Sequence, residues 1–159
     1  MRSADALRPR LLLAGAVAAC SLLVGCGSGG RLSASDYRTQ GDASCTDAHK
    51  RLLAVRAPAS AGEVNGYLQK ELAIAQEAQS RFAALHPPSS LQADHQAVVD
   101  LKRKQVAAVG GLIDQTRGKS NAQTIAAFKS ASAGLGTQDQ MINQRYRALG
   151  LRVCGTSNG

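Results

Sequence analysis

Three interruptions divide residues 35–159 into four segments, and they constrain the fold more than any other feature. Pro58 and the pair Pro87-Pro88 cannot lie inside a regular helix, because proline lacks a backbone N–H and its ring clashes with the preceding turn. Gly118 suits the left-handed conformation that commonly ends a helix. Between these residues, apolar side chains recur every three or four positions, which is the period of a helix buried on one face.

The pattern therefore predicts four helices, at approximately residues 35 or 44–56, 60–86, 89–116 and 120–149. Gly41 leaves the start of the first helix open, because glycine weakens a helix interior. Ser60 with Glu63, and Ser120 with Gln123, have the spacing of a capping box, in which two side chains satisfy free N–H groups at a helix start.

Composition and loop length predict how these helices assemble. Of all residues 44% are apolar but only 3% are aromatic, and the strand-forming residue types are sparse, which predicts an all-α fold. Short connections favour antiparallel neighbours, so we expect an up-down-up-down four-helix bundle. A seam at coiled-coil spacing marks the fourth helix: Ile125, Phe128, Ser132, Leu135, Asp139, Ile142, Tyr146 and Leu149.

Two cysteines test this topology. The start of the first helix and the end of the fourth should lie at the same end of the bundle, with Cys45 near the former and Cys154 shortly after the latter. We expect a disulfide that joins the N- and C-terminal ends; the alternative is two unpaired buried thiols. In the chain-entropy model, closing a loop of about 110 residues stabilises the fold by about 4–5 kcal/mol.

The N-terminal segment is typical of a signal peptide. Arg2, Arg8 and Arg10 precede an apolar run from Leu11 to Val24. A helix of that length measures about 21 Å, which is shorter than the ~30 Å hydrocarbon core of a bilayer. The run is therefore interpreted as a targeting segment and not as a stable membrane span.

The run ends in Leu23-Val24-Gly25-Cys26 and is followed by Gly27-Ser28-Gly29-Gly30, which resembles the bacterial lipobox. The resemblance implies a lipoprotein: acyl chains such as palmitate on Cys26, cleavage before it, and anchoring at the extracytoplasmic face of the cell membrane. Residues 1–25 are then a signal peptide, 26–34 a flexible tether and 35–159 the bundle domain. Export also makes the Cys45–Cys154 bond chemically plausible.

Two alternatives to this interpretation remain. A rival box ends at Cys20, but it leaves an apolar run of only about nine residues. An ordinary secretory signal with an incidental cysteine is the other. The resemblance ends near Gly30, and no motif in the bundle domain identifies a family.

Candidate chemistry is weak along the rest of the chain. None of His49, His86 and His95 completes the Glu-x-x-His pattern of di-iron bundles, so exposed or locally bonded histidines are expected. There is no Gly-x-Ser-x-Gly motif, and the adjacent Asp94 and His95 point in different directions on a helix. We therefore predict no catalytic residue, metal or cofactor, and no enzymatic activity.

The formal charge of +8 points to partners with negative charge, of which nucleic acids and anionic lipid headgroups are considered. Lys102-Arg103-Lys104 fans around a helix and predicts a solvated face, and with so few aromatic residues for base stacking no nucleic-acid binding is expected. Five arginines should lie at the tethered end, where anionic headgroups would attract them: Arg31, Arg38, Arg145, Arg147 and Arg152. For Arg145 and Arg147 the negative end of the helix dipole is an equal explanation. Asp139 could pair with a basic residue of another helix or lie at an exposed edge.

These observations predict a lipid-anchored, non-enzymatic binding or structural accessory domain of the cell envelope, with an unidentified envelope protein as its partner. The end of the bundle at residues 56–62 and 117–121 would face away from the membrane and offer the first surface for that partner. The alternative is a carrier of a small apolar ligand, which requires a cavity of about 300 Å³ or more inside the bundle.

Overall fold

The computed structural model describes residues 30–156, and this part of the chain is helical and contains no strand. Four long helices follow one another, α1 Ala34–Leu53, α2 Val64–Ala83, α3 Gln92–Thr116 and α4 Asn121–Ala148. Short 3₁₀ turns, η1 Ala61–Glu63 and η2 Ser89–Leu91, precede α2 and α3. The all-α prediction is confirmed.

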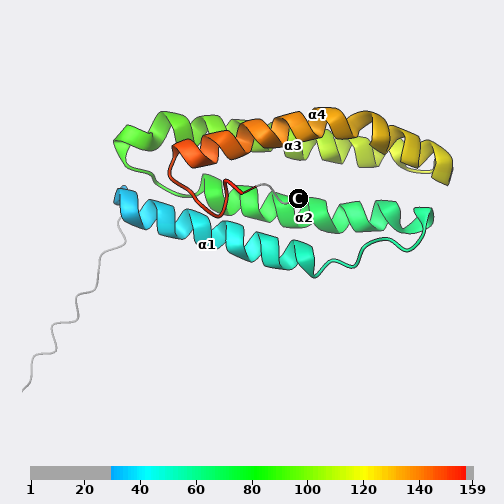
Figure 1. The fold of residues 1–159 in the computed structure, drawn as a ribbon, viewed down its shortest axis with the longest axis horizontal. Helices are drawn as coiled ribbons and strands as arrows, with labels where there is room; N and C mark the ends of the chain where they lie inside the picture. The colour runs from blue at the N-terminus through cyan, green and yellow to red at the C-terminus, as the bar shows by residue number, and fades with distance from the viewer. Residues whose placement is uncertain (1–29, 157–159) are drawn as a thin grey trace, which may run out of the picture.

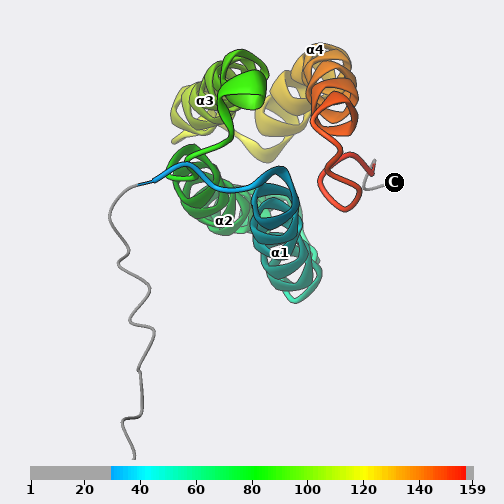
Figure 2. The ribbon, with the colours of Figure 1, turned by 90° about the vertical axis from the view of Figure 1, so that its left-hand side faces the viewer.

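Successive helices pack side by side, α1 on α2, α2 on α3 and α3 on α4 (Figures 1 and 2). One end of the molecule, here called the proximal end, holds the start of α1, the α2–α3 connection and the end of α4. There the Leu32 N–H donates to the His86 carbonyl (2.7 Å), and Arg38 Nε donates to the Leu149 carbonyl (3.1 Å). At the opposite, distal end the Thr116 hydroxyl donates to Asn65 Oδ1 (2.9 Å).

Local signals at the helix ends are confirmed in part. Ser120 and Gln123 form the predicted capping box, and Gly118 adopts a φ of 74° after α3. The capping box predicted at Ser60 is wrong: its side chain caps no N–H, and Glu63 Oε2 instead accepts from the Ala59 N–H (2.9 Å). A 3₁₀ turn stands between Ser60 and α2, so the spacing that a capping box needs is not available.

The chain joins the domain earlier than expected. Ser33 accepts a hydrogen bond from the Asp36 N–H and so caps α1, which begins at Ala34 and continues through Gly41. Arg31 already donates to the Pro87 carbonyl (3.0 Å), and Leu32 packs against the core. The last residues of the predicted tether therefore belong to the folded domain.

The core at the proximal end contains one aromatic ring from each helix. Tyr37 of α1, Phe82 of α2, His95 of α3 and Tyr146 of α4 lie with neighbouring ring centroids between 4.8 and 6.3 Å apart. The edge-to-face arrangement of Phe82 and Tyr146 is favourable at such distances, because the positive edge of one ring meets the negative face of the other. Three of the five Phe and Tyr residues of the chain thus lie in this cluster.

The seam predicted along α4 is continuous only in its second half. Ile142, Tyr146 and Leu149 are buried, whereas Ile125 is 41% exposed and Ser132 is also exposed. In the first half of α4 the seam is only partly buried, at Phe128 and Leu135, because α1 ends at Leu53; the short η1 turn also packs against α4.

The gap between α1 and α4 is bridged by the segment after α4. No Cα of α1 lies within 8 Å of a Cα of α4. Instead, Gly150 (φ 79°) reverses the chain in a Schellman motif, in which the Gly150 N–H donates to the Arg147 carbonyl and the Leu151 N–H to the Tyr146 carbonyl. Residues 150–156, here called the C-terminal tail, then run back onto α1 (Figure 2).

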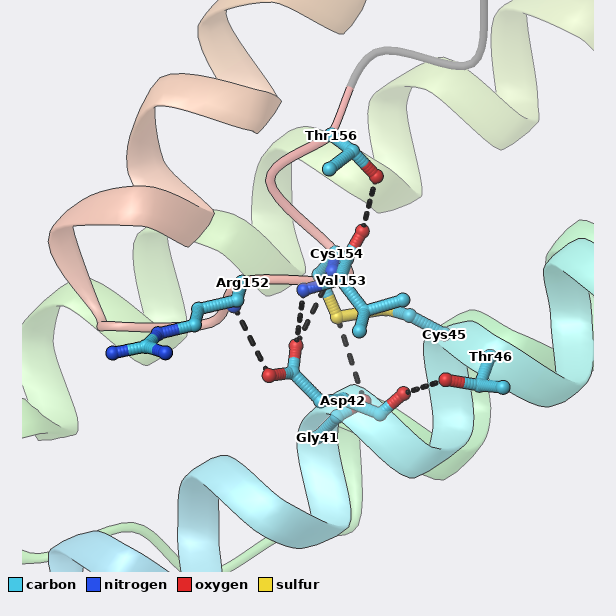
Figure 3. The surroundings of a disulfide bond; sticks show 8 residues. All are labelled: Gly41, Asp42, Cys45, Thr46, Arg152, Val153, Cys154 and Thr156. Carbon is cyan, nitrogen blue, oxygen red and sulfur yellow. Dashed lines mark hydrogen bonds between the residues drawn. A yellow bond between two sulfur atoms is a disulfide. The ribbon is translucent and has the colours of Figure 1, made fainter.

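Three consecutive contacts attach this tail to α1. Leu151 is fully buried against Gly41, and the Asp42 carboxylate accepts from the N–H groups of three successive tail residues, 152–154, at 2.8–3.3 Å (Figure 3). Cys154 forms the expected disulfide with Cys45, with a Cα–Cα distance of 5.3 Å. Because Cys45 lies in the middle of α1, the bond joins the tail to the centre of the helix and not, as predicted, to its N-terminal end.

Substitution of Gly41 by alanine should destabilise the domain. A Cβ there would lie 2.6 Å from Leu151 Cδ2, so the fully buried Leu151 side chain would have to shift. We expect a net loss of about 1 kcal/mol, since overpacking costs about 1–3 kcal/mol and alanine returns about 1 kcal/mol of helix propensity. Urea unfolding measures the change.

Gly111→Ala in α3 is the matched control, because a Cβ at Gly111 meets nothing within 4 Å. This variant should gain up to about 1 kcal/mol. Equal stabilisation by both substitutions would contradict the packing of Leu151 on Gly41.

Candidate functional site

The separation of α1 from α4 leaves a cleft between them, floored by α2 and α3. It consists of two adjoining cavities, of about 160 Å³ and about 330 Å³, which share Leu52, Ala75 and Asp139 as lining residues. The smaller cavity lies toward the proximal end, where the disulfide and the C-terminal tail form its wall. We call the whole the α1–α4 cleft.

Small and aliphatic side chains make most of the cleft wall. Alanines at positions 48, 75 and 78 leave space where longer side chains would close the gap between the helices. The larger cavity adds Leu72, Val106 and Val109. Such a wall can cover the apolar part of an elongated small molecule.

One cationic group of the cleft comes from α3. Lys102 is partly buried, and its ammonium donates to Gln105 Oε1 (2.9 Å). Burial lowers the pKa of Lys102, and the nearby Asp139 carboxylate partly opposes this change. The structure records no ion pair between Lys102 and Asp139, so the remaining N–H donors of the ammonium can serve an acidic group in the cleft.

This position corrects the sequence-based expectation for Lys102-Arg103-Lys104. Arg103 and Lys104 are exposed as predicted, but Lys102 turns inward and lines the cleft. Asp139 is partly buried and accepts from Asn143 Nδ2 (3.1 Å) on its own helix, while its charge acts on Lys102 of α3. The inward direction of Lys102 depends on the gap between α1 and α4, for which the local sequence carries no signal.

The histidines do not converge. His49 is exposed at the cleft, and His86 is exposed at the proximal end, where its carbonyl accepts from Leu32. His95 is only 3% exposed, so the expectation of an exposed or locally bonded side chain is wrong for it. Within residues 30–156 no group of three His, Cys, Asp or Glu side chains is arranged to hold a metal ion.

His95 links three helices through its ring. Its Nδ1 lies 3.1 Å from the Tyr37 hydroxyl, and the ring also hydrogen-bonds to the Ala83 backbone. A neutral imidazole suits both contacts, because one ring nitrogen can accept from a hydroxyl while the other donates to a backbone carbonyl. Burial lowers the pKa of His95, and the Ala83 contact opposes this only in part.

The five arginines lie at the proximal end as predicted. Arg31 donates to Gln92 Oε1 (2.7 Å), and Arg145 lies 3.8 Å from the Asp94 carboxylate. Arg38 and Arg147 donate to the carbonyls of Leu149 and Gly155, so both side chains bind backbone carbonyls at or just after the end of α4.

The sequence alone provides no reason to select Asp42 as a functional residue. Its role in binding the tail depends on the position of the tail beside α1.

The burial of His95 predicts that stability falls in acid. Because the pKa of His95 is lower in the folded than in the unfolded chain, the unfolded chain binds more protons below about pH 6.5, and the free energy of unfolding decreases there. The melting temperature should drop between about pH 7.5 and about pH 5.5.

His95→Gln, which does not titrate, should show a shallower decrease over the same range. Titration of the imidazole by NMR provides the direct measurement. A pKa for His95 at or above its ordinary value of about 6.5 would show that the ring is not held neutral.

Cys26 lies outside the described residues, so the structure does not bear on the lipobox. Among the helices of residues 30–156, none combines the length and the apolar character that crossing a membrane requires. The chain matches no protein family model, and no curated protein and no solved structure is significantly similar to it.

Proposed function

We propose that this chain is a bacterial lipoprotein whose helical domain is held at the extracytoplasmic face of the cell membrane by acyl chains on Cys26. In this proposal the domain is a non-enzymatic binding or structural accessory of the envelope. The observation that carries it is the Cys45–Cys154 disulfide, together with the lipobox-like Leu23–Cys26 sequence. Disulfides persist in exported proteins and are rare in the reducing cytosol, so the bond supports the extracytoplasmic location that the N-terminal sequence implies.

The path of the chain supports one orientation of the domain. Only residues 27–33 separate Cys26 from α1, and Arg31 and Leu32 are already bound to the α2–α3 connection. The proximal end then faces the membrane, and the distal end, with residues 56–62 and 117–121, faces outward toward an envelope protein. Short connections and the packing of successive helices support an antiparallel up-down-up-down order.

Anchoring makes binding effective without high affinity. A tether this short confines the domain to a thin layer beside the membrane, which raises its effective concentration toward other molecules in that layer. A binding role requires a surface that a second molecule can occupy, and the α1–α4 cleft is such a surface.

The second candidate is a carrier of a small apolar ligand in that cleft. A specific observation favours it: the larger cavity measures about 330 Å³ and continues into the smaller one. This volume reaches the ~300 Å³ that small-molecule sites usually need. Lys102 would then receive an acidic group of the ligand.

The anchor is tested by metabolic labelling with palmitate in a bacterial host. The wild-type chain should incorporate the label and show the mass of an acylated form that begins at Cys26. Cys26→Ala should lose the label, because no thiol remains to accept the lipid. Cys20→Ala is the matched control and should be labelled like the wild type; label that persists in Cys26→Ala would refute the anchor.

The carrier is tested with anilinonaphthalene sulfonate, an apolar fluorescent dye with one anionic group. We expect the folded protein to bind it and Ala75→Leu to weaken binding about tenfold, because the new side chain fills the junction of the two cavities. Ala126→Leu, on an exposed position of α4, should bind as the wild type does. Equal binding by both variants would place the dye elsewhere and reject the cleft as a carrier site.

A further inference from the structure

A second concave site lies at the proximal end, on the other side of the C-terminal tail from the cleft. It measures about 730 Å³, and three arginine residues line it, Arg38, Arg147 and Arg152. Three residues with hydroxyl side chains also line it, Ser35, Thr39 and Thr156, and the Thr156 hydroxyl donates to the Val153 carbonyl (2.7 Å). We call these three arginines and the space between them the arginine pocket.

Two of the arginines are positioned by backbone contacts. Arg38 Nε donates to the Leu149 carbonyl, and the side chain crosses Gly150 so closely that a Cβ there would lie 2.5 Å from Nε. Arg147 donates to the Gly155 carbonyl (2.6 Å), and a Cβ at Gly155 would lie 2.6 Å from its Cγ. Each contact occupies one of the five N–H donors of a guanidinium, so most donors remain for a ligand.

The pocket has an excess of positive charge. Within residues 30–156, none of Arg38, Arg147 and Arg152 forms an ion pair with a carboxylate, in contrast to Arg51, Arg81 and Arg145. The carboxylate that lines the pocket is Asp42, and its oxygens already accept three backbone N–H groups of the tail (Figure 3). An anion in the pocket would therefore meet three cations and a carboxylate turned toward the tail.

We propose that the arginine pocket binds a phosphate group. Three arginines and the hydroxyls of Ser35 and Thr39 around one concave site match the several acceptor oxygens of a phosphate, to which arginine donates in a planar fork. The phosphate belongs either to a lipid headgroup beside the proximal end or to a soluble phosphate compound. The geometry of the pocket does not depend on acylation of Cys26. The phosphate-binding proposal can therefore be tested separately from the proposed lipid anchor.

Arg152 separates binding from a purely structural role. Arg38 and Arg147 also hold the end of α4 and the tail, so their removal would disturb the fold as well as the pocket. The side chain of Arg152 is exposed, points away from the disulfide in Figure 3 and makes no hydrogen bond recorded within the described residues, although its backbone N–H is bound by Asp42. Replacement of Arg152 should leave the free energy of unfolding unchanged and lower only the affinity for phosphate.

The experiment uses the full chain with Cys26→Ala in a non-ionic detergent and a phosphate-free buffer. One arm titrates inorganic phosphate, and the other titrates short-chain phosphatidylglycerol, while NMR follows the Nε–Hε signals of the arginines. We expect the signals of Arg38, Arg147 and Arg152 to move together. Arg152→Gln should weaken binding about tenfold, which is the effect of losing one charge-assisted contact.

Lys129→Gln is the matched control, because it removes one exposed positive charge from α4 far from the pocket. It should leave the affinity within about twofold of the starting chain, since exposed charges more than a Debye length away are screened. Binding in both arms identifies phosphate itself as the ligand, and binding in the lipid arm alone identifies the headgroup; either supports the pocket. Absence of binding in both arms, or equal weakening by Arg152→Gln and Lys129→Gln, would overturn it.

Discussion

The return of the C-terminal tail onto α1 is the constraint on which the rest of the structure depends. Without it, α1 would be held by α2 and by the contact of Tyr37 with His95 of α3, because α1 and α4 do not approach each other directly. The contacts use one stretch of α1: Gly41 receives Leu151, Asp42 binds three backbone N–H groups, and Cys45 forms the disulfide. Residues four apart lie on the same face of a helix, so Gly41 and Cys45 present a continuous surface to the tail. The covalent bond therefore secures an interface that is also held by packing and by hydrogen bonds.

The same tail shapes both concave sites. Val153 and Cys154 form a wall of the α1–α4 cleft, while Arg152 and Gly155 line the arginine pocket, so a few consecutive residues separate the two. Residues 152–155 form turns, so neighbouring side chains of the tail can face different sites. A fourth helix packed directly on α1 would have closed both spaces, whereas a narrow tail leaves one open on each side.

The two ends of the molecule differ in how they are stabilised. At the proximal end, His95 is buried in a cluster with Tyr37, Phe82 and Tyr146, and its polar ring is paired with the Tyr37 hydroxyl and the Ala83 backbone. Toward the distal end the first half of α4 is largely exposed, and its seam contributes little to the core. The hydrophobic cluster thus lies toward the proximal end and extends to Cys154 of the disulfide, and the proposed membrane attachment lies at the same end.

The sequence by itself determined the four helices and most of their ends, because prolines, capping residues and apolar periodicity act within a single segment. It also identified Cys45 and Cys154 as partners and the end at which the arginines gather. Only the tertiary structure decided that His95 and Lys102 turn inward, that Asp42 holds the tail and that α1 and α4 stand apart. The physical reason is that the burial of a polar side chain is set by the groups that other helices bring beside it. Those groups are distant in the sequence, so no local pattern records them.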